Sequence, residues 1–251
     1  MPPTIVLIRH AQGLHNVDNN SPQAYEIRDP PLTDLGMQQC AELRKSLLER
    51  FSSVQNVAII SSPMRRTLQT ALLSVDWLTD RGVRIEADAD WQENSDKPCD
   101  TGSPIPSLEL DFPASIVDFA AAGLVWPDKT SPSAETYACT RGSVLRRGRR
   151  CLEKLHRRPE ELIFVFSHSG FLRLGVTGWW FFNSDYRIFR FDDDGNRDAW
   201  RHLVGEERVR PGLQQHEDTI TGGLGLSWTH RVQLGSDLPD DRDSPASPNQ
   251  Q

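Results

Sequence analysis

The sequence contains no long hydrophobic run, no export signal and no closely spaced pair of cysteines. The longest stretch of apolar appearance, residues 171–182, is interrupted by Arg173 and falls short of the ~20 residues that a membrane-spanning helix needs. The N-terminus has neither the basic segment nor the small-residue cleavage site of a signal peptide. The four cysteines are far apart in the sequence. We therefore expect free thiols, no structural zinc site, no membrane association and a cytoplasmic location.

Lysine is also scarce, and the balance of charge is acidic. The net charge is −7, so general electrostatic binding to nucleic acid is not expected. Only four of the 28 basic residues are lysine, and the others are arginine. Arginine holds phosphate or carboxylate groups with two parallel hydrogen bonds. An acidic chain of this composition can therefore still form one strongly positive pocket.

The segments that are present alternate between short apolar runs and helical patterns. Strands are predicted at residues 4–8, 57–60, 83–86, 162–166 and 186–191, and helices at 34–50 (capped by Thr33), 64–78, 135–156 and from 168 onward. This alternation predicts an α/β fold, a three-layer sandwich around a mostly parallel central sheet. Ligands of such sheets bind beyond the carboxyl ends of the strands.

The chain of 251 residues is interpreted as one domain over residues 1–235. Residues 94–134 are rich in proline and are predicted to form a long, lid-like insertion with one helix near 114–122. Residues 236–251 are polar and are predicted to be a disordered tail.

Polar and charged residues follow three of the predicted strands. The first strand ends at Arg9-His10, the second leads to Arg65 at a helix start, and the strand at 162–166 leads to His168. These strand ends would lie at the same edge of a parallel sheet, next to the N-termini of helices. Such an edge is suited to binding a phosphate group.

Four segments in order resemble the histidine phosphatase superfamily, the phosphoglycerate mutase-like enzymes. They lie at residues 9–16 (RHAQGLHN), 31–36 (PLTDLG), 62–71 (SPMRRTLQTA) and 167–170 (SHSG), and the resemblance covers about residues 4–191. Ala11 replaces the usual glycine of the first motif. Together with Gln92-Glu93 and residues 98–102 (PCDTG), the first motif looks most like that of fungal members.

The resemblance implies a phosphoglycerate mutase-like fold and a role for each matching residue. His10 would be the nucleophile that becomes phosphohistidine, and Glu93 would be the general acid and then the base. His168 would hydrogen-bond the phosphoryl group as charge develops on it. The other implied ligands of the phosphoryl group are Arg9, Asn16, Arg65 and Ser169. Arginines and helix dipoles supply the positive charge, so no metal and no cofactor is expected.

The function predicted from this site is a metal-independent phosphatase that hydrolyses a small-molecule phosphate monoester. A glycolytic mutase would carry a tyrosine- and glycine-rich segment after the acid, and residues 94–99 (NSDKPC) do not resemble one. Three alternatives stay open. One is a specialised-metabolism enzyme that acts on a phosphorylated or diphosphorylated intermediate, including a terpenoid one, or that does non-phosphoryl acid/base chemistry. The others are a mutase-type phosphotransferase and a non-catalytic phosphate-binding module.

Several other features have a structural interpretation. His15 is expected to be a loop residue, Arg66 a solvated helix residue, and the arginines between 141 and 158 one exposed helix face. The aromatic run at residues 179–182 is expected to belong to the core, with lining of the pocket as the alternative. The oligomeric state is not predicted.

Overall fold

The computed structural model describes residues 1–17, 22–192 and 212–241. Its strands are β1 (Thr4–Arg9), β2 (Val57–Ser61), β3 (Ile85–Ala87), β4 (Val117–Asp118), β5 (Leu162–Ser167), β6 (Tyr186–Asp192) and β7 (Gly212–Gln215). The α-helices are α1 (Asp34–Phe51), α2 (Arg65–Ser74), α3 (Asp76–Thr79), α4 (Ile105–Asp111), α5 (Arg141–His156) and α6 (Ser169–Phe171), which continues as a π-helix over Leu172–Thr177. Short 3₁₀ helices cover Leu14–Asn16, Pro22–Glu26, Ala89–Trp91, Pro98–Asp100, Ala120–Ala122, Pro132–Tyr137 and Glu217–Thr219.

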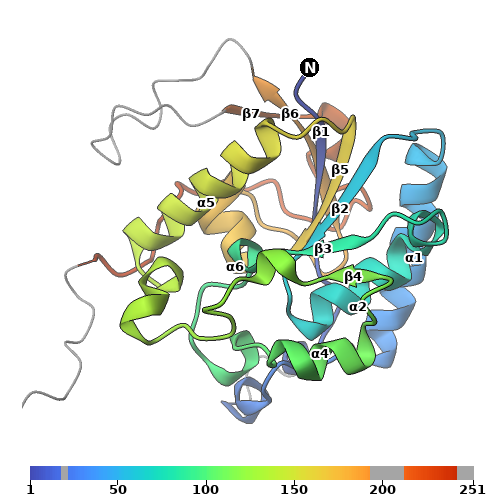
Figure 1. Ribbon diagram of the computed structural model, residues 1–251. Coiled ribbons are helices and arrows are strands. Elements are labelled where there is room, and N and C mark those ends of the chain that lie inside the picture. The colour runs from blue at the N-terminus through green and yellow to red at the C-terminus, as the bar shows by residue number, and fades with distance from the viewer. Residues whose placement is uncertain (18–21, 193–211, 242–251) are drawn as a thin grey trace, which may run out of the picture.

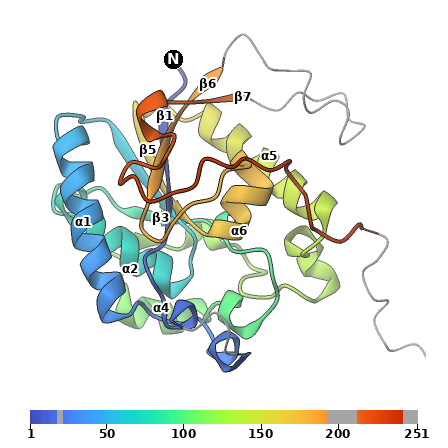
Figure 2. The same ribbon diagram turned by 180° about the vertical axis from the view of Figure 1, so that it is seen from behind.

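A mixed sheet of seven described strands lies at the centre, in the order β4-β3-β2-β5-β1-β6-β7. The strands from β4 to β1 are parallel, whereas β6 and β7 are antiparallel to their neighbours. Helices α1 and α2 cover one face of the sheet, and α5 and α6 cover the other (Figures 1 and 2). This three-layer α/β arrangement confirms the predicted fold class.

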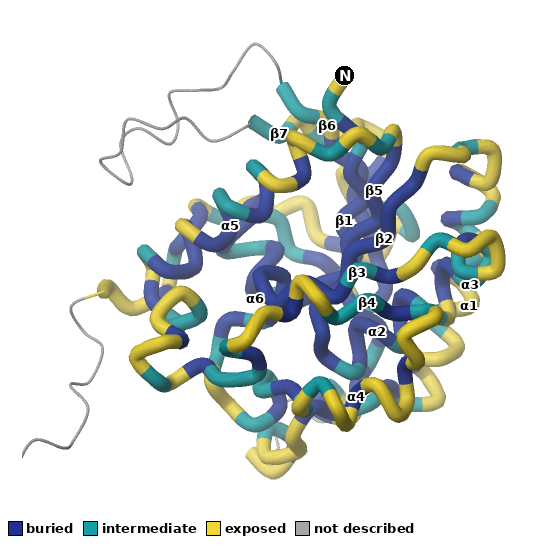
Figure 3. The backbone as a smooth tube through the Cα atoms, viewed as in Figure 1, coloured by how far each residue is buried: buried dark blue, intermediate teal, exposed yellow. Residues whose placement is uncertain are grey.

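Both faces of the central strands are buried, which explains their almost continuous apolar sequences. Along β1, Val6 and Ile8 pack with the core on the side of α1 and α2. Ile5 and Leu7, which point the other way, pack with the core on the side of α5. The tube in Figure 3 is accordingly dark blue along β1, β2 and β5.

The predicted insertion is an ordered part of the described structure. Its C-terminal half adds β4 to the edge of the sheet, where Val117 pairs with Ile85. The prediction of a helix at 114–122 is wrong, because Val117 is an extended, buried edge residue there. The predicted helix 135–156 is in fact two segments, since Thr140 caps α5 by accepting a hydrogen bond from the Ser143 amide.

Two further expectations about the surface are corrected. The described residues 236–241 of the predicted disordered tail pack against α5: Leu238 is buried in the core, and the Arg141 amide donates to the Pro239 carbonyl. Residues 242–251 lie outside the described part of the chain.

On α5 itself, Arg147 is buried rather than exposed, and its guanidinium lies 4.0 Å from the ring centroid of Phe171.

The aromatic run at 179–182 is divided between the core and the surface. Phe181 is fully buried in the core, as expected. Trp180 stacks on Trp228 with ring centroids 4.4 Å apart, and Phe182 is partly exposed. None of the described helices is both long enough and apolar enough to cross a membrane.

Candidate active site

Two histidines meet where the central parallel strands end. β1 ends at Arg9 and β5 ends at Ser167, and these two residues are paired in register. The next residue after each strand is a histidine, so His10 and His168 become neighbours, with ring centroids 5.2 Å apart. Both side chains are buried. The sheet topology therefore brings together two residues that are far apart in the sequence.

The contacts of His10 determine which ring nitrogen carries its proton. Nδ1 lies 2.7 Å from the Ala11 carbonyl oxygen, which can only accept, so Nδ1 carries the hydrogen. Nε2 then has a free lone pair, and the Arg66 Nε–H donates to it at 3.3 Å. Burial and the charges of Arg66, Arg9 and His15 hold the pKa of His10 well below its usual value. His10 is therefore a neutral imidazole whose Nε2 is available as a nucleophile.

The arginine that lies between the histidines is Arg66, not Arg65 as predicted. Arg66 is 1% exposed, and its guanidinium contacts both His10 and His168. The Arg65 side chain points to the outer side of the helix start and pairs with the half-exposed Asp111 at 2.5 Å. Adjacent residues of a helix are rotated by about 100° from each other, so only one of the two arginines can face the strand ends. The interpretation of Arg66 as a solvated helix residue is wrong for the same reason.

His168 is fixed by a contact at each ring nitrogen. The Nη2 group of Arg66 lies 3.0 Å from Nδ1, and arginine can only donate, so Nδ1 is the acceptor. The proton on Nε2 is then donated to Ser62 Oγ at 2.9 Å. Burial and the charge of Arg66 lower the pKa of His168 well below its usual value. Ser62, which the sequence analysis assigned no role, is therefore the residue that orients the second histidine.

Glu93 lies beside this cluster on the loop that follows Ala89–Trp91. Its carboxyl oxygens accept hydrogen bonds from three backbone amides, those of Gly170 (3.0 Å), Phe171 (2.8 Å) and Asn94 (2.9 Å). Burial, and then the nearby Asp100 carboxylate, raise the pKa of Glu93 above its usual value, although the amides and Arg66 act in the opposite direction. The carboxyl group can therefore hold a proton in a site where an exposed glutamate would have lost it.

Arg9 approaches the cluster from the end of β1. One of its Nη groups donates to the Phe181 carbonyl at 3.0 Å, whereas its buried Nε has no hydrogen-bond partner. Burial lowers its pKa to about 10, and the nearby Glu93 partly compensates. Arg9 is therefore still a cation at neutral pH, with one donor that remains available to an anion.

The two predicted phosphoryl ligands that remain lie at the border of the cluster. Asn16 Oδ1 accepts from the Gly13 amide and from Asn183 Nδ2, and the same Asn183 group also donates to the His10 carbonyl. Ser169 follows His168 directly and begins α6. The structure thus brings His10, Glu93, His168 and Arg9 together and places Asn16 and Ser169 next to them.

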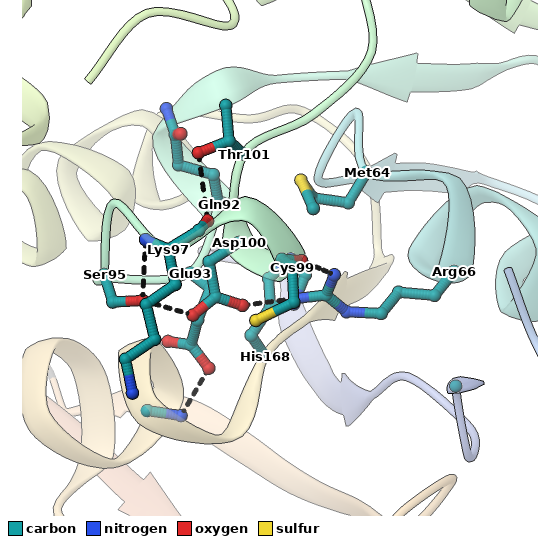
Figure 4. A network of polar contacts seen from close by, with 12 residues as sticks. Met64, Arg66, Gln92, Glu93, Ser95, Lys97, Cys99, Asp100, Thr101 and His168 are labelled. Atoms are coloured by element: carbon teal, nitrogen blue, oxygen red, sulfur yellow. Dashed lines mark hydrogen bonds and ion pairs between the residues drawn. The ribbon is translucent and has the colours of Figure 1, made fainter. Parts of the chain in front are cut away.

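Three more titratable residues were not predicted to be part of the site. Asp100 pairs with Arg66 Nη2 at 2.9 Å (Figure 4). The buried Lys129 donates to the carbonyl oxygens of Glu93 and Ser95, and burial lowers its pKa to about 8. His15, expected to be a plain loop residue, is buried with its ring 5.6 Å from that of His10, and burial lowers its pKa to about 3.

Positive charge at this site comes from arginine and lysine side chains. Among the described residues, no group of three or more histidine, cysteine, aspartate or glutamate side chains is arranged to hold a metal ion.

Comparisons with known proteins identify the family to which this site belongs. A model of the histidine phosphatase superfamily (branch 1) matches residues 5–192. Phosphoglycerate mutase-like protein 1 of Arabidopsis thaliana is 30% identical over 203 residues, which cover 67% of this chain and 69% of that protein. A probable phosphatase of Schizosaccharomyces pombe is 28% identical over 172 residues, which cover 68% and 76%. The solved structure of an ecdysone phosphate phosphatase from Bombix mori is 16% identical with a TM-score of 0.49, and the match covers 80% of this chain and 100% of that one. The chain belongs to the histidine phosphatase superfamily.

Proposed function

We propose that this protein is a metal-independent phosphatase that hydrolyses a small-molecule phosphate monoester through phosphohistidine at His10. The observation that carries the proposal is the state of the His10 ring. Its Nδ1 proton is donated to a backbone carbonyl, and its unprotonated Nε2 accepts a hydrogen bond from the buried cation Arg66. A phosphatase-named relative in S. pombe supports hydrolysis over other chemistry.

In the first step, His10 Nε2 attacks phosphorus and the bond between phosphorus and the ester oxygen breaks. Glu93 gives its proton to the leaving oxygen, so that an alcohol departs rather than an alkoxide. Arg9 and Arg66 donate hydrogen bonds to the phosphoryl oxygens, whose charge develops in the transition state. His168 would join them with its Nε2–H, which Ser62 accepts in the structure. Asn16 and Ser169 would supply further polar contacts to the same group.

In the second step, Glu93 is a carboxylate and takes a proton from a water molecule. The water oxygen bonds to phosphorus, the bond between phosphorus and Nε2 breaks, and inorganic phosphate is released. His10 returns to its neutral form with Nδ1 still protonated. The cycle is balanced without a metal or a redox partner.

The decisive experiment compares the protein with its His10→Asn variant on a generic aryl phosphate, with and without a chelator. We expect turnover that resists the chelator and disappears in the variant, and acid-labile phosphate on His10 in rapidly quenched samples. Turnover that persists in His10→Asn would refute the mechanism.

A matched pair of variants tests which arginine holds the phosphoryl group. A charge-assisted hydrogen bond contributes about 1.5–3 kcal/mol, so Arg66→Met should lower kcat/KM on the order of a hundredfold. Arg65→Met removes a guanidinium one residue away that pairs with Asp111, so kcat/KM should stay near that of the unmodified protein. Equal losses in both variants would contradict the assignment.

Two alternatives have a specific observation in their favour. A phosphotransferase is favoured by the A. thaliana relative named phosphoglycerate mutase-like, and it predicts transfer to a phosphoglycerate acceptor in place of phosphate release. A specialised enzyme for an apolar phosphate or diphosphate is favoured by the half-buried Trp180, which stacks on the exposed Trp228. It predicts turnover of such substrates but not of sugar or aryl phosphates.

A pure binding module predicts phosphate binding in His10→Asn with no turnover in the unmodified protein. The single-domain organisation, the cytoplasmic location and the fungal resemblance stay predictions.

A further inference from the structure

The Arg66 guanidinium forms an ion pair with a carboxylate of the protein itself, that of Asp100. Asp100 Oδ1 lies 2.9 Å from Nη2, in a pair whose side chains are 1% and 14% exposed. Ser95 Oγ donates to the other carboxylate oxygen at 2.6 Å, which fixes the orientation of the group. Figure 4 shows the Asp100 carboxylate beside that of Glu93, in front of Arg66.

The donors of Arg66 are almost all occupied. Nε donates to His10, Nη1 to the Cys99 carbonyl, and Nη2 contacts both Asp100 and His168. A guanidinium has five N–H groups, so one remains without a contact. A phosphoryl group that binds at His10 must therefore share Arg66 with the Asp100 carboxylate.

Asp100 is an anion under ordinary conditions. Its burial opposes ionisation, but the charges of Arg66 and Lys129 and the hydrogen bond from Ser95 together hold its pKa below the usual range. A phosphate dianion next to it meets a fixed negative charge in a buried site, where salt screens the repulsion less than at the surface.

We propose that Asp100 is an internal counter-anion of this site. It neutralises the charge of Arg66 when no phosphate is bound, and it lowers the affinity of the site for product phosphate. This inference rests on the proposed function, because it takes the surroundings of His10 as the phosphate site. It gives the insertion at 94–134 a specific part in the reaction: the insertion carries the charge that limits phosphate affinity and speeds product release.

The test is the affinity of Asp100→Asn for inorganic phosphate, measured by calorimetry at pH 7. Asparagine keeps the shape and an oxygen for Arg66 but removes the charge. Like charges in a buried site shift ionic equilibria about tenfold or more, so the dissociation constant should fall about tenfold. The inhibition constant for phosphate and the KM of a phosphate ester should fall with it.

The matched control is Asp111→Asn, which removes the same charge from the Arg65 pair and should leave phosphate affinity unchanged. If Asp100 only holds Arg66 in place, Asp100→Asn will bind phosphate as the unmodified protein does or more weakly, and the inference is overturned. Should circular dichroism show that Asp100→Asn does not fold, Asp100→Ser provides the same comparison. Failure of the proposed function appears separately, as turnover that survives in His10→Asn.

Discussion

At the scale of single residues, Gly170 is the position where a missing side chain leaves room for the catalytic acid. A Cβ there would lie 2.6 Å from Glu93 Oε1. The carboxyl group is the flexible end of a side chain, so it would move while the backbone stays. We expect Gly170→Ala to keep its melting temperature and to lose about a hundredfold in kcat/KM on an alkyl phosphate, the scale of general acid catalysis. Steady-state kinetics and a thermal melt measure both quantities.

The control for Gly170→Ala is an aryl phosphate with a good leaving group, which needs no proton from Glu93 to depart. The same variant should therefore lose much less activity on that substrate. Equal losses on both esters, together with a lower melting temperature, would mean that the methyl group disturbs the fold rather than the acid.

The two reacting side chains have pKa values shifted in opposite directions, which sets the pH dependence. Lowering the pH protonates His10 Nε2 and stops attack, but the pKa of His10 is held well below its usual value of about 6.5. Raising the pH removes the proton from Glu93, whose pKa is raised by burial. We expect kcat/KM for an alkyl phosphate to keep its value well below pH 6.5 and to decline at higher pH. An acidic midpoint at 6.5 or above would contradict the neutral state of His10.

The pair Arg65 and Arg66 shows how far sequence reasoning can go at this scale. The motif at residues 62–71 indicates that an arginine of this segment belongs to the site, but which of the two adjacent arginines faces it depends on helix phase. A signal was present: Thr70 and Ser74 follow Arg66 at intervals of four and share its buried side. Thr70 Oγ1 accepts from the Ala11 amide, directly beside His10. Small polar residues at helical spacing thus indicate the side of α2 that faces the loop of His10 and Ala11.

At the scale of elements, α5 and the π-helix that follows α6 approach each other closely. A Cβ on Gly148 would lie 1.9 Å from the Gly175 carbonyl oxygen, and backbone atoms cannot give way as a side chain can. Overpacking of this kind costs about 1–3 kcal/mol. For a chain of this size, Gly148→Ala should lower the melting temperature by about 2–4 °C for each kcal/mol.

The exposed Arg146 on the same helix provides the control for Gly148→Ala. Arg146→Ala removes a surface pair with Asp241 and one hydrogen bond to Ser143 Oγ but fills no space between the helices, so its melting temperature should change by about 1–2 °C at most. A Gly148→Ala protein as stable as the unmodified one would show that the two helices can separate at little cost.

Helix ends were predictable where a capping residue could be read. Thr33 was expected to cap a helix from Asp34, and its hydroxyl does accept from the Gly36 amide. Thr140 has the same function for α5, although the sequence pattern alone predicts a helix that begins near residue 135. The insertion could not be assigned in this way, because its order depends on distant contacts such as the pairing of Val117 with Ile85.

At the scale of the whole molecule, residues 236–241 near the C-terminus pack against α5 and cover part of the core. Leu238 is buried in the core beside α5, and the Pro239 carbonyl accepts from the Arg141 amide. A truncation after residue 235 exposes this surface and should lower the free energy of unfolding by about 2 kcal/mol, the value of one buried leucine. Truncation after residue 241 keeps every described contact and is the control. Equal stability of the two truncated proteins in urea would contradict the packing.

The sequence predicted the α/β class and the edge of the sheet where the site lies, because strand and helix patterns are local. It did not predict Asp100, Lys129 or Ser62 as part of the site. Ser62 contacts His168, Lys129 contacts the Glu93 carbonyl and Asp100 contacts Arg66, and each contact depends on the folded arrangement of the insertion or of the end of β2. Side-chain contacts between distant segments leave no periodic pattern in a single sequence.

The position of β5 between β1 and β2 has a consequence for synthesis on the ribosome. β1 and β2 emerge before β5, and neither can complete its pairing with this shared neighbour until residue 167 has left the exit tunnel. At about 5–20 residues per second, the hundred or so residues between β2 and β5 take on the order of ten seconds. During that interval the nascent chain carries two apolar strands without their shared neighbour, a state that binds chaperones and aggregates readily. His10 is synthesised about 160 residues before His168, so the paired histidines of the site form only after β5 has been made.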